Sequence, residues 1–160
     1  MSADYALRQL TRDDLGLMRG LLLLFGQVFE QMDTYVHQQP SDAYLSDLLA
    51  RDHFLAVVAV QDGAVVGGLT VYELRKYEQP RSELYIHDLA VAAAHRRRGI
   101  ATALIGEVQK IAVVRGAHTV VVQADTAPED EPAIALYSKL GRMERVLHFD
   151  IPVDGGPREI

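Results

Sequence analysis

The sequence contains no cysteine among its 160 residues. Disulfides, thiolate-bound zinc and a cysteine nucleophile are therefore excluded. The chain also lacks any apolar run approaching the roughly 20 residues that a membrane-spanning helix needs. Its first residues, Met-Ser-Ala-Asp, do not have the basic-then-apolar order of a secretory signal. We therefore expect a cytoplasmic protein. No metal site is expected, because the histidines lack metal-ligand spacing; they include His53, His95, His118 and His148.

Basic charge is in deficit, with 16 Lys and Arg against 22 Asp and Glu and a net charge of −6. This balance argues against a nucleic-acid partner. The charges are also unevenly distributed. Arg96, Arg97 and Arg98 form a basic cluster, whereas an acidic stretch contains Asp125, Glu129, Asp130 and Glu131. Such a distribution suits one anionic and one cationic ligand, although solvated loops of opposite sign explain it equally well.

The length and the apolar pattern predict one α+β domain over residues 1–160, with a frayed tail of a few residues. The expected order is βααβββαβαβ. Strands are expected at residues 5–9, 54–60, 64–74, 83–91, 119–123 (buried) and 145–150. Helices are expected from an N-cap at Thr11 to about Phe29, from a cap at Ser41 through Leu49, and at residues 99–115 and 132–140. Asp62-Gly63 predicts a hairpin turn, and residues 30–40 a loop.

The segment from Tyr85 to Leu104 is the most informative part of the chain. A strand leads into a basic turn that contains Gly99 and opens a long helix. This order directs several backbone N–H groups and the positive helix end at one point, and glycine lets a phosphate approach closely. The turn lacks the three glycines of a dinucleotide fingerprint and the lysine of a P-loop. An ordinary basic helix start is the alternative interpretation.

Two motifs are similar to those of a known superfamily. Arg96-x-x-Gly99-x-Ala101 after an apolar strand resembles the acetyl-CoA signature of the GNAT N-acetyltransferases, and residues 133–141 resemble their later signature. Further segments resemble the type I aminoglycoside 3-N-acetyltransferases, namely residues 34–35, 37–40, 78–83, 85–86, 88–91, 122–125 and 148–150. The resemblance implies a GNAT fold, with a mixed, mostly antiparallel sheet flanked by about four helices. It also implies acetyl-CoA-dependent acetylation of the 3-amino group of deoxystreptamine in gentamicin-like antibiotics, which confers resistance.

The resemblance also implies which residues bind acetyl-CoA. The pyrophosphate would lie on backbone N–H groups of the turn and helix start, and the pantetheine arm would pair with the main chain of a strand. The implied residues are Leu89, Ala90, Val91, Arg96, Arg97, Arg98, Gly99, Ile100, Ala101, Thr102 and Tyr137.

Acetyl transfer needs a proton acceptor for the amine and a proton donor for the departing thiolate. Tyr137 resembles the GNAT general acid; a packed helix tyrosine is the alternative. His87 stands where many GNATs have a base, although the aminoglycoside subgroup commonly has tyrosine there.

Asp88 recurs in that subgroup, where it would bind or deprotonate the amine, but it would point to the opposite face of the strand unless a β-bulge intervenes. A structural carboxylate is the alternative for Asp88, and the choice of base stays open. With no cysteine and no recognisable serine triad, we expect direct attack by the amine.

A carboxylate rim with tyrosines is expected to hold the polycationic amine; its residues are Asp33, Tyr35, Glu83, Tyr85, Asp125, Glu129, Asp130 and Asp150. Asp130 replaces an asparagine that usually contacts pantetheine in GNATs, so it is assigned to either ligand. The alternatives are a GNAT for another polyamine such as spermidine, a GNAT for a protein amine, and a non-catalytic acyl-CoA-binding module. The expected partners are the amine and CoA, without nucleic acid or membrane, and a homodimer is compatible with the sequence.

Overall fold

The computed structural model describes residues 4–155. The chain divides into two compact units, the first ending at Gln123 and the second beginning at Ala124. All five strands of the sheet belong to the first unit. The second unit contains a 3-10 turn, η3 (Pro128–Asp130), and the helix α4 (Glu131–Leu140).

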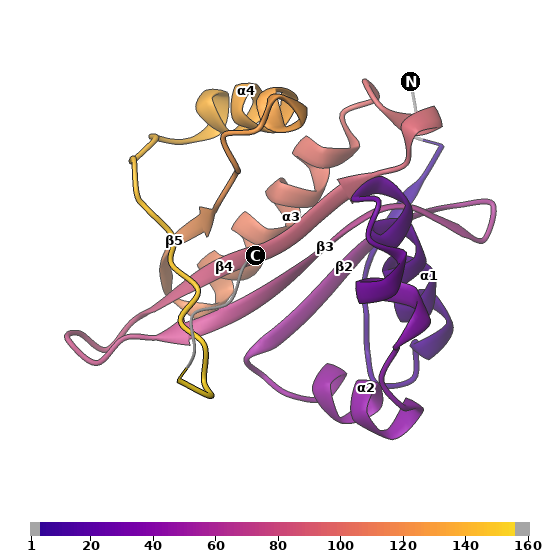
Figure 1. Cartoon of the computed structure of the whole chain (residues 1–160), viewed down its shortest axis with the longest axis horizontal. Helices are drawn as coiled ribbons and strands as arrows, with labels where there is room; N and C mark the ends of the chain where they lie inside the picture. The colour runs from indigo at the N-terminus through magenta and orange to yellow at the C-terminus, as the bar shows by residue number, and fades with distance from the viewer. Residues whose placement is uncertain (1–3, 156–160) are drawn as a thin grey trace. The chain divides into compact units, whose positions relative to one another are not determined.

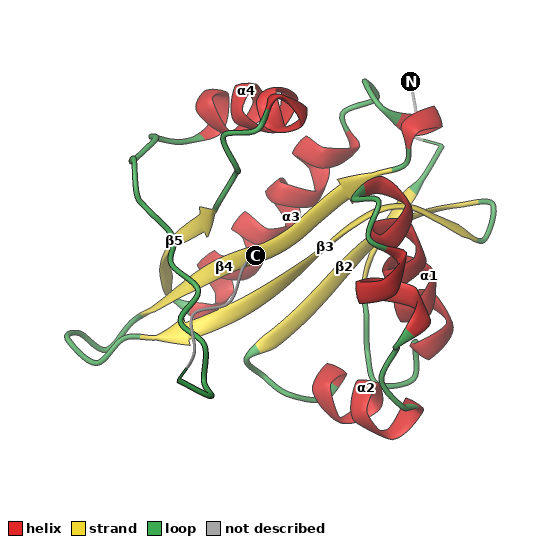
Figure 2. Ribbon diagram, in the orientation of Figure 1, coloured by secondary structure: helices red, strands yellow, loops and turns green. Residues whose placement is uncertain are grey.

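The sheet has the strand order β1-β2-β3-β4-β5 (Figures 1 and 2). The strands are β1 (Ala6–Gln9), β2 (Phe54–Gln61), β3 (Ala64–Arg75), β4 (Ser82–Val91) and β5 (Ala117–Val122). The first four are antiparallel, and β5 runs parallel to β4. A parallel pair needs a long crossover, and the helix α3 (Ile100–Arg115) supplies it. The expected hairpin between β2 and β3 is confirmed, and Asp62 and Gly63 both adopt the positive φ that a type I′ turn requires.

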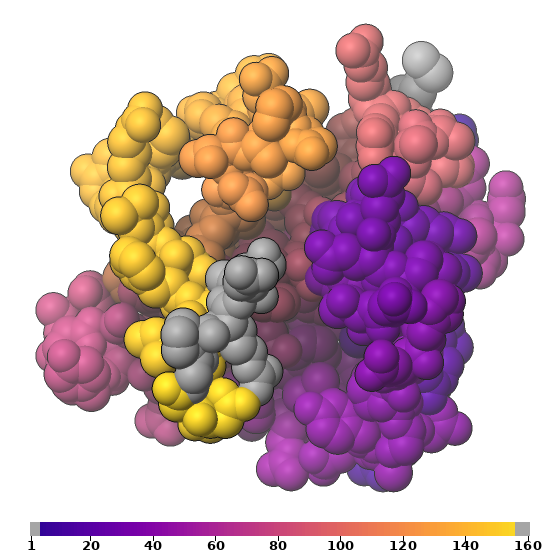
Figure 3. Space-filling model, viewed as in Figure 1, coloured from indigo at the N-terminus to yellow at the C-terminus, as the bar shows by residue number. Residues whose placement is uncertain are grey.

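Helices cover both faces of this sheet. On one face lie α1 (Leu15–Val28), a π-helical turn η1 (Asp33–His37) and α2 (Asp42–Leu49), whose residues form a continuous indigo to violet surface in Figure 3. On the other lies α3. Two adjacent glycines in β3 contact the helices on the two faces. A Cβ on Gly68 would overlap Leu21 of α1, and a Cβ on Gly67 would lie 2.9 Å from Ile100 of α3. These glycines let both helices approach the strand closely. None of the helices within residues 4–155 is long and apolar enough to cross a membrane.

The start of α1 differs from the prediction. Thr11 is not the N-cap, because the helix begins at Leu15 with Asp14 as its N-cap. The Asp14 carboxylate instead accepts hydrogen bonds from the backbone N–H of Thr11 at 2.7 Å and from Arg8 at 2.7 Å. These bonds, the Thr11 one first, lower the pKa of Asp14 and organise the turn before the helix. The cap at Ser41 is confirmed, since its hydroxyl accepts from the N–H of Tyr44.

Two expectations near the C-terminus are wrong. The strand at β5 is partly exposed rather than buried, because it is an edge strand with β4 on one side. Residues 145–150 form no strand, and Val146 and Leu147 of this segment are exposed. A strand needs a neighbour for its N–H and C=O groups, and the described part of the second unit contains no other strand. The expected loop at residues 30–40 contains the turn η1, and part of the expected tail lies outside the described residues.

Candidate functional site

A β-bulge in β4 is the first feature of the site. Thr70 of β3 lies opposite Asp88, but the next residue, Val71, lies opposite Ile86, so His87 is an extra residue in β4. Thr70 and Tyr72 are two residues apart in β3 and therefore point to the same face of the sheet. Their cross-strand partners, Asp88 and Tyr85, consequently share that face as well. The bulge on which the role of Asp88 depended is present. It turns this carboxylate toward the face covered by α1 and α2.

The Asp88 carboxylate has a partner from a distant part of the chain. The hydroxyl of Tyr35, in η1, donates a hydrogen bond to Asp88 Oδ2 at 3.0 Å. Burial raises the pKa of Tyr35 strongly, and the negative charge of Asp88 raises it further. The phenol therefore stays protonated at neutral pH and acts as a donor.

His87 is exposed and lies between two tyrosine rings. Its imidazole meets Tyr72 at 5.7 Å between ring centroids and Tyr85 at 5.9 Å, both edge to face. The Tyr85 hydroxyl donates to Gln123 Oε1 at 3.1 Å, which fixes that ring. One carboxylate among tyrosine rings is an environment that attracts a cationic amine by charge and by cation–π contact.

The turn between β4 and α3 has the geometry of an anion site. Gly99 is the N-cap of α3 in the left-handed conformation, with φ of +77°, and a Cβ there would meet no atom within 4 Å. The N–H of Ala103 bonds to the carbonyl of Gly99 at 2.9 Å. The N–H groups of residues 100–102 precede this first helical bond and point out of the helix end. Open space at Gly99 and N–H groups at a positive helix end fit a phosphate of acetyl-CoA.

The three arginines of this turn differ in their contacts. Arg96 Nε donates to the carbonyl of Val91 at 3.3 Å. Arg98 contacts Gln61 at 2.9 Å and His95 at 2.8 Å, so it braces the turn against the β2–β3 hairpin. Arg97 is exposed, has a positive φ of 62° and makes no side-chain hydrogen bond or ion pair within residues 4–155. Arg97 is therefore the one of these three arginines whose guanidinium has no protein partner among the described residues.

The edge of β4 beyond the bulge is open on the β5 side. β5 pairs with β4 from Ser82 to Ile86, and Figure 2 shows β5 as a short arrow beside the first half of β4. No strand of the described chain pairs on this side with residues 89–91. A free main-chain edge at Leu89 to Val91 can accept an extended ligand as an added strand. This geometry fits the expected pantetheine contact, although the Val91 carbonyl already accepts from Arg96.

These features agree with comparisons to known proteins. The model of the Acetyltransferase (GNAT) family matches residues 22–141. The chain belongs to this family. The GNAT fold and family expected from the sequence are thereby confirmed, and acyl-CoA is the acyl donor of the family.

Three relatives of this GNAT protein are informative. A crystal structure of an aminoglycoside acetyltransferase from an uncultured soil metagenomic sample is 57% identical, with a TM-score of 0.92, over 96% of this chain and 99% of the other. A second such enzyme from soil, solved in complex with sisomicin, is 31% identical, with a TM-score of 0.85, over 93% and 96%. The aminoglycoside N(6′)-acetyltransferase type 1 of Salmonella typhimurium is 27% identical over 69% of this chain and 80% of its own.

The second unit of the GNAT chain carries Tyr137 on α4. Burial raises the pKa of Tyr137, and the charge of Asp130 raises it further, so the phenol is protonated at neutral pH. Asp130 Oδ2 accepts from the backbone N–H of Asp125 at 2.7 Å, and Asp125 Oδ1 accepts from the N–H of Thr126 at 2.7 Å. Both carboxylates thus carry charge and also stabilise the loop that precedes α4. Glu129 is exposed.

The remaining predicted substrate residues are not all brought together. Asp33 lies in η1, two residues before Tyr35, and is paired with His37 at 2.6 Å. Glu83 lies near the start of β4 and pairs with Lys76 at 3.3 Å and His118 at 3.5 Å. These partners keep Glu83 in a separate cluster from Tyr35 and Asp88. Asp150 is exposed beside His148 at 3.1 Å.

Sequence reasoning missed Tyr72 as part of the site. Tyr72 meets the His87 ring and is half-buried, and burial raises its pKa, with smaller effects of Tyr44 and Asp88. The signal that could have found it is the cross-strand register, in which Tyr72 faces Tyr85. The pair lies between the β3–β4 turn and the bulge, so its register is set by that turn.

Proposed function

We propose that this GNAT protein is an acetyl-CoA-dependent N-acetyltransferase of aminoglycoside antibiotics. The observation that carries the proposal is the Asp88 carboxylate, held among tyrosine rings beside the free edge of β4. Such a site binds a cationic amine next to the expected path of the acyl donor. The relatives at 57% and 31% identity, both aminoglycoside acetyltransferases, support the same substrate class.

Backbone groups hold the acyl donor in this proposal. The N–H groups of residues 97–102 and the Arg97 guanidinium bind the pyrophosphate, and the main chain of residues 89–91 aligns the pantetheine arm. Acetyl-CoA supplies the acetyl thioester. Because these contacts are mostly backbone, the apolar side chains of Leu89, Ile100 and Ala101 are compatible with them.

The proton-transfer roles follow from the chemistry of the side chains. Asp88 binds and orients the substrate ammonium. His87 accepts its proton, directly or through water, since an imidazole is a better base near neutral pH than a carboxylate. The amine nitrogen then bonds to the carbonyl carbon as the carbon–sulfur bond breaks. The nitrogen loses its second proton to water, and Tyr137 donates a proton to the leaving thiolate and is reprotonated from solvent. Because the amine attacks the thioester directly, no acetyl-enzyme forms.

The site of acetylation is the finer part of the proposal. Seven segments of the chain, residues 88–91 among them, resemble the type I enzymes that modify the 3-amino group. The Salmonella relative is instead a 6′-enzyme, at 27% identity. We propose the 3-amino group of deoxystreptamine. NMR of the product acetylated from gentamicin decides between the positions, and acetylation at the 6′-amine would contradict the 3-amino assignment.

Thiol release from acetyl-CoA tests the substrate class. Gentamicin, kanamycin, spermidine and a histone peptide should be compared at equal concentration, and we expect turnover with the antibiotics. Expression of the gene in a susceptible host should raise the inhibitory concentration of gentamicin. Preference for spermidine or for the peptide would contradict the aminoglycoside proposal. Binding of acetyl-CoA without turnover of any amine would identify a non-catalytic acyl-CoA-binding module.

A further inference from the structure

Tyr35 is held in place from two sides. Its ring packs on Phe25 of α1 and on Phe29, the C-cap of that helix, at 5.7 Å from each centroid, and these two phenylalanines stack on each other at 5.5 Å. Phe25 is fully buried and anchors the cluster in the core. The ring of Tyr35 therefore has little freedom to rotate away from Asp88.

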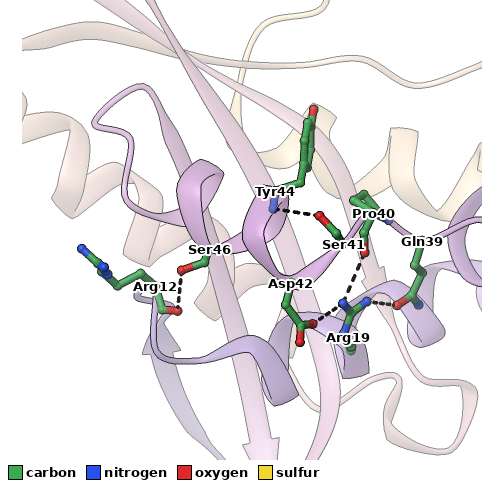
Figure 4. Close-up of polar contacts among 8 residues, drawn as sticks. All are labelled: Arg12, Arg19, Gln39, Pro40, Ser41, Asp42, Tyr44 and Ser46. Carbon is green, nitrogen blue, oxygen red and sulfur yellow. Dashed lines mark hydrogen bonds and ion pairs between the residues drawn. The ribbon is translucent and has the colours of Figure 1, made fainter.

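The backbone of Tyr35 is fixed by a polar chain that begins on α1 (Figure 4). The guanidinium of Arg19 donates to the side chain of Gln39, to the carbonyl of Pro40 and to Asp42. The amide of Gln39 in turn donates to the carbonyl of Tyr35 at 3.2 Å. The turn η1 is thus tied to both α1 and α2. The hydroxyl of Tyr35 is held where it meets one oxygen of Asp88.

We infer that Tyr35 is a positioning residue that acts through Asp88, an inference that rests on the proposed function. Its hydroxyl donates a hydrogen bond to Oδ2 of Asp88 at 3.0 Å, so Oδ1 remains available to accept a hydrogen bond from the substrate ammonium. Asp88 follows a bulge, where the strand ladder is interrupted, so a hydrogen bond from outside the sheet compensates for the lost rigidity. Tyr35 was expected to contact the antibiotic; in this role it orients the group that does.

Replacement of Tyr35 by phenylalanine removes the hydroxyl and keeps the ring packing. For Tyr35→Phe we expect kcat/KM for gentamicin to fall about ten- to a hundred-fold, the range for a hydrogen bond to a charged group. The KM for acetyl-CoA and the unfolding midpoint should change little. Gln39→Met, which releases the Tyr35 carbonyl, should cause a smaller loss in the same direction. Tyr77→Phe is the control, because Tyr77 is 99% exposed on the β3–β4 loop.

A double-mutant cycle separates positioning from direct contact. Gentamicin affinity should be measured by calorimetry for the wild type, Tyr35→Phe, Asp88→Ala and the double variant. If Tyr35 acts through Asp88, its replacement has no further effect once Asp88 is alanine. Additive losses would mean that Tyr35 contacts the antibiotic itself and would overturn the positioning role. An unchanged Tyr35→Phe enzyme would overturn it as well.

Failure of the proposed function gives a different result. A wild-type protein that neither binds nor acetylates any aminoglycoside contradicts that function, whatever Tyr35 does. An active enzyme without coupling between the two positions rejects the positioning role alone.

Discussion

At the scale of single residues, the proposed chemistry divides the proton transfers between side chains that differ in exposure. His87 is exposed, which suits a group that passes a proton to water. Tyr137 is half-buried, and the raised pKa of its phenol keeps the proton that the thiolate needs. Asp88 is half-buried and hydrogen-bonded, which suits a group that orients the substrate.

Tyr137→Phe tests the donor role. We expect kcat to fall by about a hundred- to ten-thousand-fold, the usual effect of losing general acid catalysis, with little change in acetyl-CoA affinity. Steady-state kinetics with gentamicin, together with calorimetric titration of acetyl-CoA, measure both quantities. A phenylalanine variant as fast as the wild type, or ping-pong kinetics, would contradict direct attack assisted by Tyr137.

At the scale of secondary structure, the turn before α3 is proposed to bind the donor mainly through its backbone. We expect Gly99→Val to weaken acetyl-CoA binding more than Arg97→Ala. A valine at φ of +77° is strained, and its side chain enters the open space that a phosphate would occupy. Calorimetric titration of both variants provides the comparison, with thermal unfolding to correct for strain. Wild-type affinity in Gly99→Val would reject the phosphate site.

The C-terminal end of α3 is attached to the sheet by Glu73. Arg115 donates to one carboxylate oxygen at 2.6 Å and Ser82 to the other at 2.6 Å. Burial alone would raise the pKa of Glu73, but these two hydrogen bonds and the Arg115 charge outweigh it, and the pKa is lowered. The folded state therefore stabilises the charged carboxylate of Glu73 relative to the unfolded state. This contribution is present above the ordinary pKa of 4.5 and is lost as pH falls through the lower folded value.

Glu73→Gln should thus destabilise the protein by about 1–3 kcal/mol at neutral pH. The difference in unfolding free energy between wild type and variant should shrink as the pH is lowered from neutral to below the ordinary pKa of 4.5. Urea denaturation at both pH values measures it. Glu144→Gln is the control, because Glu144 forms an exposed ion pair with Arg142 and its replacement should leave the free energy of unfolding nearly unchanged. Gln123→Glu would not serve, because Gln123 accepts a hydrogen bond from Tyr85. A difference that is constant with pH would exclude a charge contribution from Glu73.

Elements with a strong local signal were predictable from the sequence. Runs rich in β-branched residues on either side of Asp62-Gly63 indicated β2 and β3, and the helical spacing of Leu104 and Val108 indicated α3. The bulge at His87 was not predictable, because it depends on pairing with β3 rather than on local pattern. The same holds for residues 145–150, where an apolar segment resembles a strand but has no strand beside it in the described second unit.

The geometry of the candidate site was predictable where a local motif determines the backbone conformation, as at the turn that contains Gly99. It was less predictable where side chains meet across long distances in sequence. Tyr35 and Asp88, which form a hydrogen bond, are separated by 53 positions in the sequence. Glu83 instead forms ion pairs with Lys76 and His118. Acidic composition alone could not show which carboxylates are already occupied by local partners.

At the scale of the whole molecule, a net charge of −6 should attract a polycationic antibiotic at long range. Salt screens such attraction, with a Debye length of about 10 Å at 0.1 M. We expect the KM for gentamicin to rise with ionic strength. The KM for acetyl-CoA should rise less, because salt screens the long-range repulsion between this anion and a protein of net charge −6 as well as its attraction to the basic turn. Asp125→Asn and Asp150→Asn should weaken antibiotic use modestly, because both side chains are exposed. Asp88→Asn should be more damaging, because its carboxylate lies on the strand at the bulge and is half-buried. Thiol release at low and high salt for each variant measures these effects. A KM for gentamicin that is independent of salt would contradict electrostatic capture of the antibiotic and leave the acetyl-transfer site unaffected.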